Sequence, residues 1–107
     1  MFERLRYLQD EEHDYLSELL VTYLDSAPKL LDTLRAAIAG SDVSVTQRAA
    51  HTLKGSSASL GATTLTAHCT ELEMLARAGT LTGAAEWLQK IENEYVRVKR
   101  ALEMELK

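Results

Sequence analysis

Cysteine and proline are nearly absent from this chain of 107 residues, which contains one of each. The single cysteine, Cys69, excludes an internal disulfide, and its place on the apolar face of an expected helix indicates a small buried hydrophobe. The first residues show no apolar run typical of a signal peptide, and no apolar stretch of about 18 residues, the length of a membrane span, occurs. These absences predict a cytoplasmic protein without a membrane partner.

An excess of positive charge is also lacking, because the formal net charge is −4 and no basic run occurs. This balance argues against nucleic-acid binding. A glycine-rich phosphate loop is absent too, so ATP binding is not expected. His13 and His68 each have at most one carboxylate at helical ligand spacing, Asp10 and Glu71, and Cys69 points about 100° away from His68 on a helix, so neither histidine belongs to a set of metal ligands. No bound metal or cofactor is therefore predicted; we place His13 on the surface and His68 at the edge of the core.

Helical periodicity is the dominant pattern of the chain. Apolar residues recur at helical spacing throughout and nowhere alternate as they do in a strand. With 46% hydrophobic and 26% charged residues, residues 1–107 are expected to form one domain around one core. Four apolar stripes joined by short turns predict an all-α fold, an up-down antiparallel four-helix bundle with a short N-terminal helical segment.

The first half of the chain carries the N-terminal segment and one long stripe. Phe2, Leu5 and Leu8 mark the segment, which we expect to lie over one end of the bundle, and the acidic residues from Asp10 onward predict a helix start. The stripe that follows comprises Leu16, Leu20, Leu24, Ala27, Leu31, Leu34 and Ile38. Pro28 lies inside it and predicts either a kink or a break capped by Ser26; the unbroken phase favours the kink.

Glycines punctuate the rest of the chain. Gly40 is expected to end the first long helix, with Ser41 or Asp42 capping the second, and Gly61 to end the second. Thr63 or Thr64 begins the third helix, Gly79 ends it, and Thr82 is a plausible cap for the last. The third stripe contains Leu65, Cys69, Leu72, Leu75 and Ala76, and the last contains Ala84, Leu88, Ile91, Tyr95, Val98 and Leu102. The last stripe forms an a/d seam that the core itself needs, which favours a monomer over a coiled-coil dimer.

One histidine lies on the wet side of the second helix. Around Leu53 as the centre of the buried face are grouped Val45, Ala49, Ala50, Ser56, Ser57 and Leu60. His51 falls about 160° from Leu53 on the helical wheel and is expected to face solvent. Gln47, Arg48, Lys54, Gly55 and Ala58 share its stripe at helical spacing.

The chemistry of this stripe suits phosphoryl transfer. An exposed neutral imidazole is a nucleophile at physiological pH, and the cations of Lys54 and Arg48 lie one turn to either side, where they can offset the charge of a phosphoryl group. Gly55 costs about 1 kcal/mol relative to alanine in a helix interior, and it supports no buried packing, so a partner is expected to approach there. The hydroxyls of Ser56 and Ser57 are expected to bond back to the helix backbone.

The sequence around His51 resembles the phosphoacceptor motif of histidine-containing phosphotransfer (HPt) domains, His-x-Leu-Lys-Gly-Ser-x-x-x-Leu-Gly-Ala. The matching residues are His51, Leu53, Lys54, Gly55, Ser56, Leu60, Gly61 and Ala62. The flanking helices also resemble the family's, but they are generic; among their residues are Leu31, Leu34, Ala37 and Ile38 upstream and Leu65, Cys69, Leu72, Glu73 and Ala76 downstream.

The resemblance implies a four-helix bundle whose histidine carries phosphoryl groups between response-regulator receiver domains, or receives them from a sensor histidine kinase. His51 is then the phosphoacceptor, Lys54 stabilises the phosphate charge, and the rest of the stripe binds the partner. No carboxylate cluster near His51 is apparent, so magnesium is expected in the partner receiver. The domain is expected to be a carrier without autonomous kinase activity.

Two alternatives stay open. One is a helical adaptor that binds receiver or kinase domains through the same stripe without chemistry at His51. The other is a phosphoacceptor module excised from a hybrid or chemotaxis-type sensor kinase, although a methionine start and a lysine end are typical of a free-standing protein.

Overall fold

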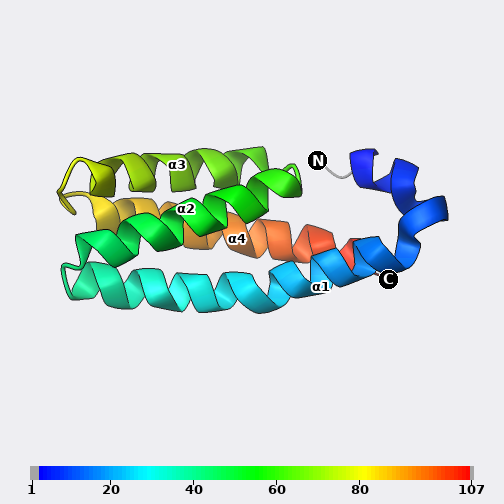
Figure 1. The fold of residues 1–107 in the computed structure, drawn as a ribbon, viewed down its shortest axis with the longest axis horizontal. Coiled ribbons are helices and arrows are strands. Elements are labelled where there is room, and N and C mark those ends of the chain that lie inside the picture. Colours follow the sequence, from blue (N-terminus) through cyan, green and yellow to red (C-terminus); the bar gives the residue numbers. More distant parts are fainter. Residues whose placement is uncertain (1–2, 107) are drawn as a thin grey trace.

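The structure is a computed structural model that describes the backbone of residues 3–106 and the side chains of residues 16–106. Its helices are α1 (Glu3–Ala39), α2 (Val43–Ser59), α3 (Thr63–Arg77) and α4 (Ala84–Glu105). Each helix packs on the next one, and α4 packs back on α1. The short connections alternate between the two ends of the molecule (Figure 1). The expected up-down antiparallel four-helix bundle is confirmed.

The N-terminal part of α1 extends beyond the bundle (Figure 1). Because α1 begins at Glu3, the N-terminal segment runs directly into the long helix, and the helix start predicted at Asp10 is wrong. Acidic residues stabilise a first turn but do not prevent a helix from continuing upstream, where no glycine or proline interrupts it. The structure describes neither Phe2 nor the side chains of residues 3–15. The predictions that this segment packs over the end of the bundle and that His13 lies on the surface therefore fall outside the described residues.

Pro28 lies within α1, which continues through it without a break. The hydroxyl of Ser26 donates to the carbonyl of Tyr23 in the same helix, at 3.5 Å, and does not cap a new one. The continuity that the phase of the apolar stripe predicted is therefore confirmed.

Asp42 begins α2. Its Oδ1 accepts a hydrogen bond from the Val45 N–H at 3.1 Å, which decides between the two expected caps in its favour. At the other end, Gly61 has a φ of 76°, a left-handed conformation that closes a helix without strain in glycine.

The start of α4 differs from the prediction. Gly83, with a φ of 85°, is the N-cap and offers no side chain for capping. The Thr82 N–H donates to Thr80 Oγ1 at 3.1 Å, so these threonines stabilise the turn itself and Thr82 is not the cap. α3 begins at Thr63, which is one of the two residues, Thr63 and Thr64, predicted to start it.

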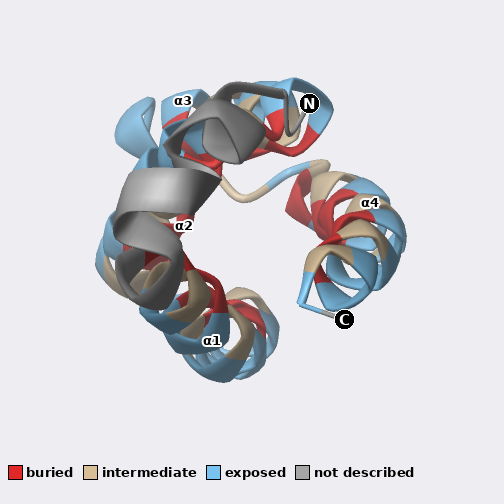
Figure 2. Ribbon diagram, turned by 90° about the vertical axis from the view of Figure 1, so that its right-hand side faces the viewer, coloured by how far each residue is buried: buried red, intermediate tan, exposed pale blue. Residues whose placement is uncertain are grey.

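The core lies between the inward faces of the four helices (Figure 2). The predicted seam of α4 is buried at every position, and Cys69 is fully buried, which raises the pKa of its thiol to about 12. Thr46 is an unpredicted core residue whose hydroxyl donates to the Asp42 carbonyl at 2.8 Å. No helix in the described part of the chain combines the length and apolar character needed to cross a bilayer.

The two serines after Gly55 behave differently. Ser56 donates to the Leu53 carbonyl at 3.2 Å, as predicted. Ser57 is fully buried, and its hydroxyl lies 2.9 Å from the Tyr23 hydroxyl on α1, so the prediction that it bonds to its own helix backbone is wrong. A buried hydroxyl on the inward face meets a neighbouring helix, and here that helix supplies a polar partner.

Candidate functional site

His51 stands on the outward face of α2. Its side chain is 64% exposed, whereas Leu53, on the opposite face of the same helix, is fully buried. The rotation of α2 predicted from the sequence is therefore confirmed. Because solvent reaches the imidazole, a partner protein can reach it as well.

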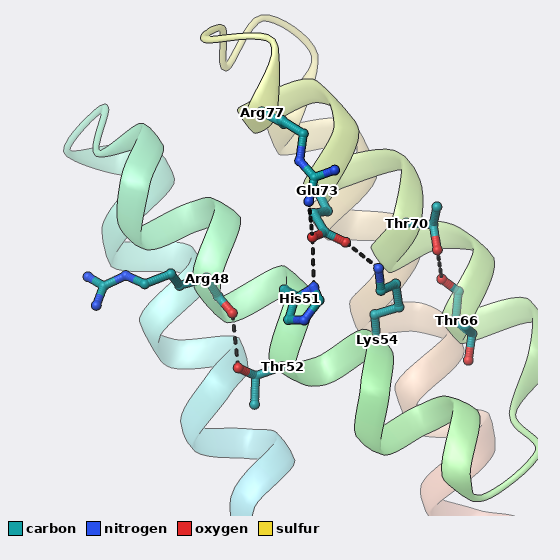
Figure 3. A network of polar contacts seen from close by, with 8 residues as sticks. All are labelled: Arg48, His51, Thr52, Lys54, Thr66, Thr70, Glu73 and Arg77. Carbon is teal, nitrogen blue, oxygen red and sulfur yellow. Dashed lines mark hydrogen bonds and ion pairs between the residues drawn. The ribbon is translucent and has the colours of Figure 1, made fainter.

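A buried carboxylate from α3 contacts this imidazole (Figure 3). Glu73 Oε2 lies 2.8 Å from His51 Nδ1 and 3.2 Å from Arg77 Nη2, and Glu73 Oε1 lies 2.6 Å from Lys54 Nζ. The Glu73 side chain is only 4% exposed. One carboxylate thus joins two side chains of α2 and one of α3.

The Glu73 carboxylate is held in its ionised form by these partners. The hydrogen bond from the Lys54 ammonium is the main cause that lowers the pKa of Glu73 below its ordinary value, and the contact with His51 acts in the same direction. Burial opposes them, because a low-dielectric interior disfavours the charged form. The net direction is downward, so Glu73 is a carboxylate at neutral pH.

An ionised carboxylate can only accept hydrogen bonds, and this fixes the state of the imidazole. In neutral His51 the proton must lie on Nδ1, where it is donated to Glu73, and the lone pair must lie on Nε2. The same contact restricts rotation of the ring, as in other sites where a carboxylate sets the tautomer of a histidine. Nε2 is therefore the ring nitrogen that keeps a free lone pair.

Glu73 lies within the apolar stripe of α3. Cys69, Leu72 and Ala76 are buried on that helix, and Glu73 completes the helical spacing i, i+3, i+4 and i+7 with them. A carboxylate at such a position must meet a cation when it is buried. That rule is the signal that finds this residue. Within the sequence, Glu73 stands out only through the family resemblance, and no pattern indicates a role for Arg77.

An open hollow of about 390 Å³ lies beside the imidazole. Its lining residues are Gln47, Arg48, His51, Thr52, Glu73 and Arg77. Two of the residues predicted to bind a partner, Gln47 and Arg48, thus lie at one edge of His51. Lys54 does not line the hollow.

The other two predicted partner residues are exposed and small. A Cβ atom added to Gly55 would meet no atom within 4 Å. Close packing between helices is therefore not the reason for a glycine at this position. Ala58 is also exposed, one turn further along α2. The face of α2 beyond His51 therefore carries only short side chains, and a partner can come close to the helix there. We call this part of the surface, formed by Gly55 and Ala58, the low face of α2.

Known proteins resemble this chain in sequence and in fold. The family model of the Hpt domain matches residues 18–101. The chain belongs to the Hpt domain family. It is 30% identical to histidine-containing phosphotransfer protein 2 of Arabidopsis thaliana over 106 residues, covering 95% of this chain and 68% of that protein. Histidine-containing phosphotransfer protein 4 of the same plant is also 30% identical, over 105 residues, with 95% of this chain and 83% of that protein covered.

A solved structure shows the same fold. Histidine-containing phosphotransfer protein B from Pseudomonas aeruginosa superposes with a TM-score of 0.90 at 32% identity, covering 97% of this chain and 91% of that one. As an Hpt domain, this chain is an intermediate of a phosphorelay, and Hpt proteins interact there with receiver domains and kinases.

Within this Hpt domain, His68 is not part of the site. The His68 ring packs on Trp87 of α4, with ring centroids 5.9 Å apart, and His68 is half-buried, as predicted for the edge of the core. Arg48 extends away from His51 along the surface of α2 (Figure 3).

Proposed function

We propose that His51 is the phosphoacceptor of this phosphorelay intermediate and that it reacts through Nε2. The observation that carries the proposal is the 2.8 Å contact between its Nδ1 and the buried carboxylate of Glu73, made by an imidazole that is itself exposed. The contact leaves the nucleophilic nitrogen on the free side of the ring.

The transfer step follows from this arrangement. The Nε2 lone pair attacks the phosphorus of an aspartyl phosphate on a receiver, the bond from phosphorus to the aspartate oxygen breaks, and the aspartate leaves as a carboxylate. The proton stays on Nδ1, so the phosphorylated ring carries a positive charge next to Glu73. Return transfer to another receiver is the reverse step, in which the leaving group is a neutral imidazole.

The partner is proposed to approach over the low face of α2. Gly55 and Ala58 let a receiver come close to His51, with Gln47 and Arg48 at the opposite edge of the ring. Magnesium is assigned to the receiver, because the carboxylate at this site, Glu73, is already paired with the cations of Lys54 and Arg77 and bonded to the His51 imidazole. We propose a cytoplasmic monomer that carries phosphoryl groups and has no kinase activity of its own, with a sensor histidine kinase upstream of it.

The buried carboxylate favours this function over a purely binding adaptor. Burying a charge is expensive unless it is fully paired, and an adaptor that used only its surface would not require one aimed at an exposed imidazole. A nucleophile that must keep one tautomer does require it.

Incubation with phosphorylated receivers of the source organism tests the proposal. Wild-type protein should acquire an acid-labile phosphoryl group, His51→Gln should acquire none, and the control His68→Gln should behave as wild type. His51→Gln should lower the free energy of unfolding by only about 1 kcal/mol, because it removes one of the three contacts to Glu73 and leaves the other two in place. Acid-labile labelling that persists in His51→Gln would overturn the assignment.

A further inference from the structure

The charge of Lys54 is already neutralised by an ion pair within the protein. Its ammonium lies 2.6 Å from Glu73 Oε1, and its side chain is only 29% exposed. Lys54 and Glu73 together are neutral, so little of this positive charge is left for a phosphoryl group on His51. The motif position alone, one turn from His51, does not show this, because Glu73 comes from another helix.

Arg77 occupies a different position. Its Nη2 contacts the same Glu73 oxygen as His51 Nδ1, so its guanidinium lies next to the imidazole. The Arg77 side chain is 65% exposed and lines the open hollow beside His51, which Lys54 does not. A guanidinium has five N–H donors, and the Glu73 contact needs only part of them.

We propose that Arg77, and not Lys54, supplies the charge that meets the phosphoryl group on His51, while Lys54 is a positioning residue that acts through Glu73. This inference rests on the proposed function of His51. A phosphoryl group on Nε2 carries a charge of about −1.5 to −2. It would stand on the solvent side of the ring, where the exposed guanidinium of Arg77, at the rim of the hollow, reaches it by turning away from Glu73. Arg48 lies on the same rim and can add a second cation by turning its side chain.

Loading with phosphoramidate tests the proposal without a cognate receiver. In this reaction the Nε2–P bond forms, the P–N bond of phosphoramidate breaks and ammonia leaves, while the Nδ1 proton stays in place. The loading rate of His51 is measured by mass spectrometry with site localisation, in wild type, Arg77→Gln, Lys54→Ala, Glu73→Gln and the pairwise combinations with Glu73→Gln. Arg97→Gln, an exposed arginine of α4, is the matched control.

Arg77→Gln should slow loading about tenfold in both the wild-type and the Glu73→Gln background, and high salt should reduce the effect. Arg77→Lys should restore part of the rate. Lys54→Ala should slow loading of the wild type, yet in the Glu73→Gln background it should change the rate by less than about twofold, because both substitutions break the same pair. Lys54→Arg, which keeps the charge on Glu73, should load nearly as wild type.

Two results would overturn the proposal. One is a Lys54→Ala effect that is as large in the Glu73→Gln background as in the wild type. The other is an Arg77→Gln rate within about twofold of the Arg97→Gln control. Wild-type His51 that loads no faster than His68 would overturn the proposed function and this inference together, whereas efficient wild-type loading with the wrong variant pattern would overturn the inference alone.

Discussion

At the scale of single residues, Glu73 determines the chemistry of the site. It is buried, yet it stays ionised because His51 and Lys54 from α2 and Arg77 from α3 surround it. The contacts with His51 and Lys54 also join α2 to α3. The carboxylate therefore affects both the reactivity of the imidazole and the stability of the fold, and the two effects can be separated by pH.

Acid should weaken the fold through Glu73. Its pKa is lower in the folded protein than in the unfolded chain, so between these two values the unfolded chain binds more protons and the free energy of unfolding falls as the pH falls. Glu73→Gln should cost about 1.5–3 kcal/mol at pH 7, the range for hydrogen bonds to charged groups. This cost should shrink below about pH 4, as the wild-type carboxyl is protonated.

Urea titrations of both proteins at several pH values measure this difference, with Glu71→Gln, an exposed position on α3, as the control. A cost of Glu73→Gln that stays constant down to pH 2 would mean that the carboxylate does not carry the charge assigned to it.

Leu53 tests the rotation of α2. Its side chain is fully buried, so Leu53→Ala should lower the free energy of unfolding by about 2–5 kcal/mol through the cavity it leaves. Chemical denaturation measures the change, and His51→Gln on the opposite face, which leaves no cavity, is the comparison with the smaller expected cost. A neutral Leu53→Ala would place the helix in another orientation.

The residue scale also shows what the sequence can predict. The exposure of His51 follows from periodicity within one helix, and it was predicted correctly. The partner of His51 could not be found in that way, because Glu73 lies 22 positions further along the chain and on another helix. Spacing within a helix determines which residues share a face, but contacts between helices depend on how those faces dock.

At the scale of elements, α2 combines a packed face with a low exposed one. The exposed face contains Gly55, where the space for a side chain is empty. A glycine there lowers helix stability without any gain in packing. Stability and function should therefore respond in opposite directions to a larger residue at this position.

Gly55→Ala should raise the free energy of unfolding by about 0.5–1 kcal/mol through better helix propensity. Gly55→Gln should melt at the wild-type temperature or above it, yet lose most phosphotransfer from a receiver, because its side chain occupies the approach path. Thermal melts and transfer rates check both, with Ala67→Gln on the exposed face of α3 as the control. An unfolded Gly55→Gln, or one that transfers normally, would contradict this placement of the docking face.

The ends of the helices are harder to predict from the sequence than their buried faces. Asp42 and Gly61 were correct, because a capping carboxylate and a left-handed glycine act locally. Thr82 was wrong, since its hydroxyl and that of Thr80 bond to each other in the turn. Several residues in a short turn can satisfy the same backbone groups, and the sequence alone does not rank them.

At the scale of the whole molecule, the four helices close around a single core that includes Cys69. The thiol is fully buried and its pKa is raised to about 12, so the native protein should resist alkylation by iodoacetamide at pH 8. Modification should appear only in parallel with unfolding as urea is added. Rapid modification in native buffer would show that the core opens locally around α3.

The central claim is that Glu73 directs phosphorylation to one nitrogen of His51. Heteronuclear NMR of the protein with ¹⁵N-labelled histidine, recorded after phosphorylation by a receiver, tests it most directly. The account predicts that phosphorus is bonded to Nε2 of His51 and that the proton remains on Nδ1. Phosphorus bonded to Nδ1, or a phosphoryl group on any other residue, would contradict it.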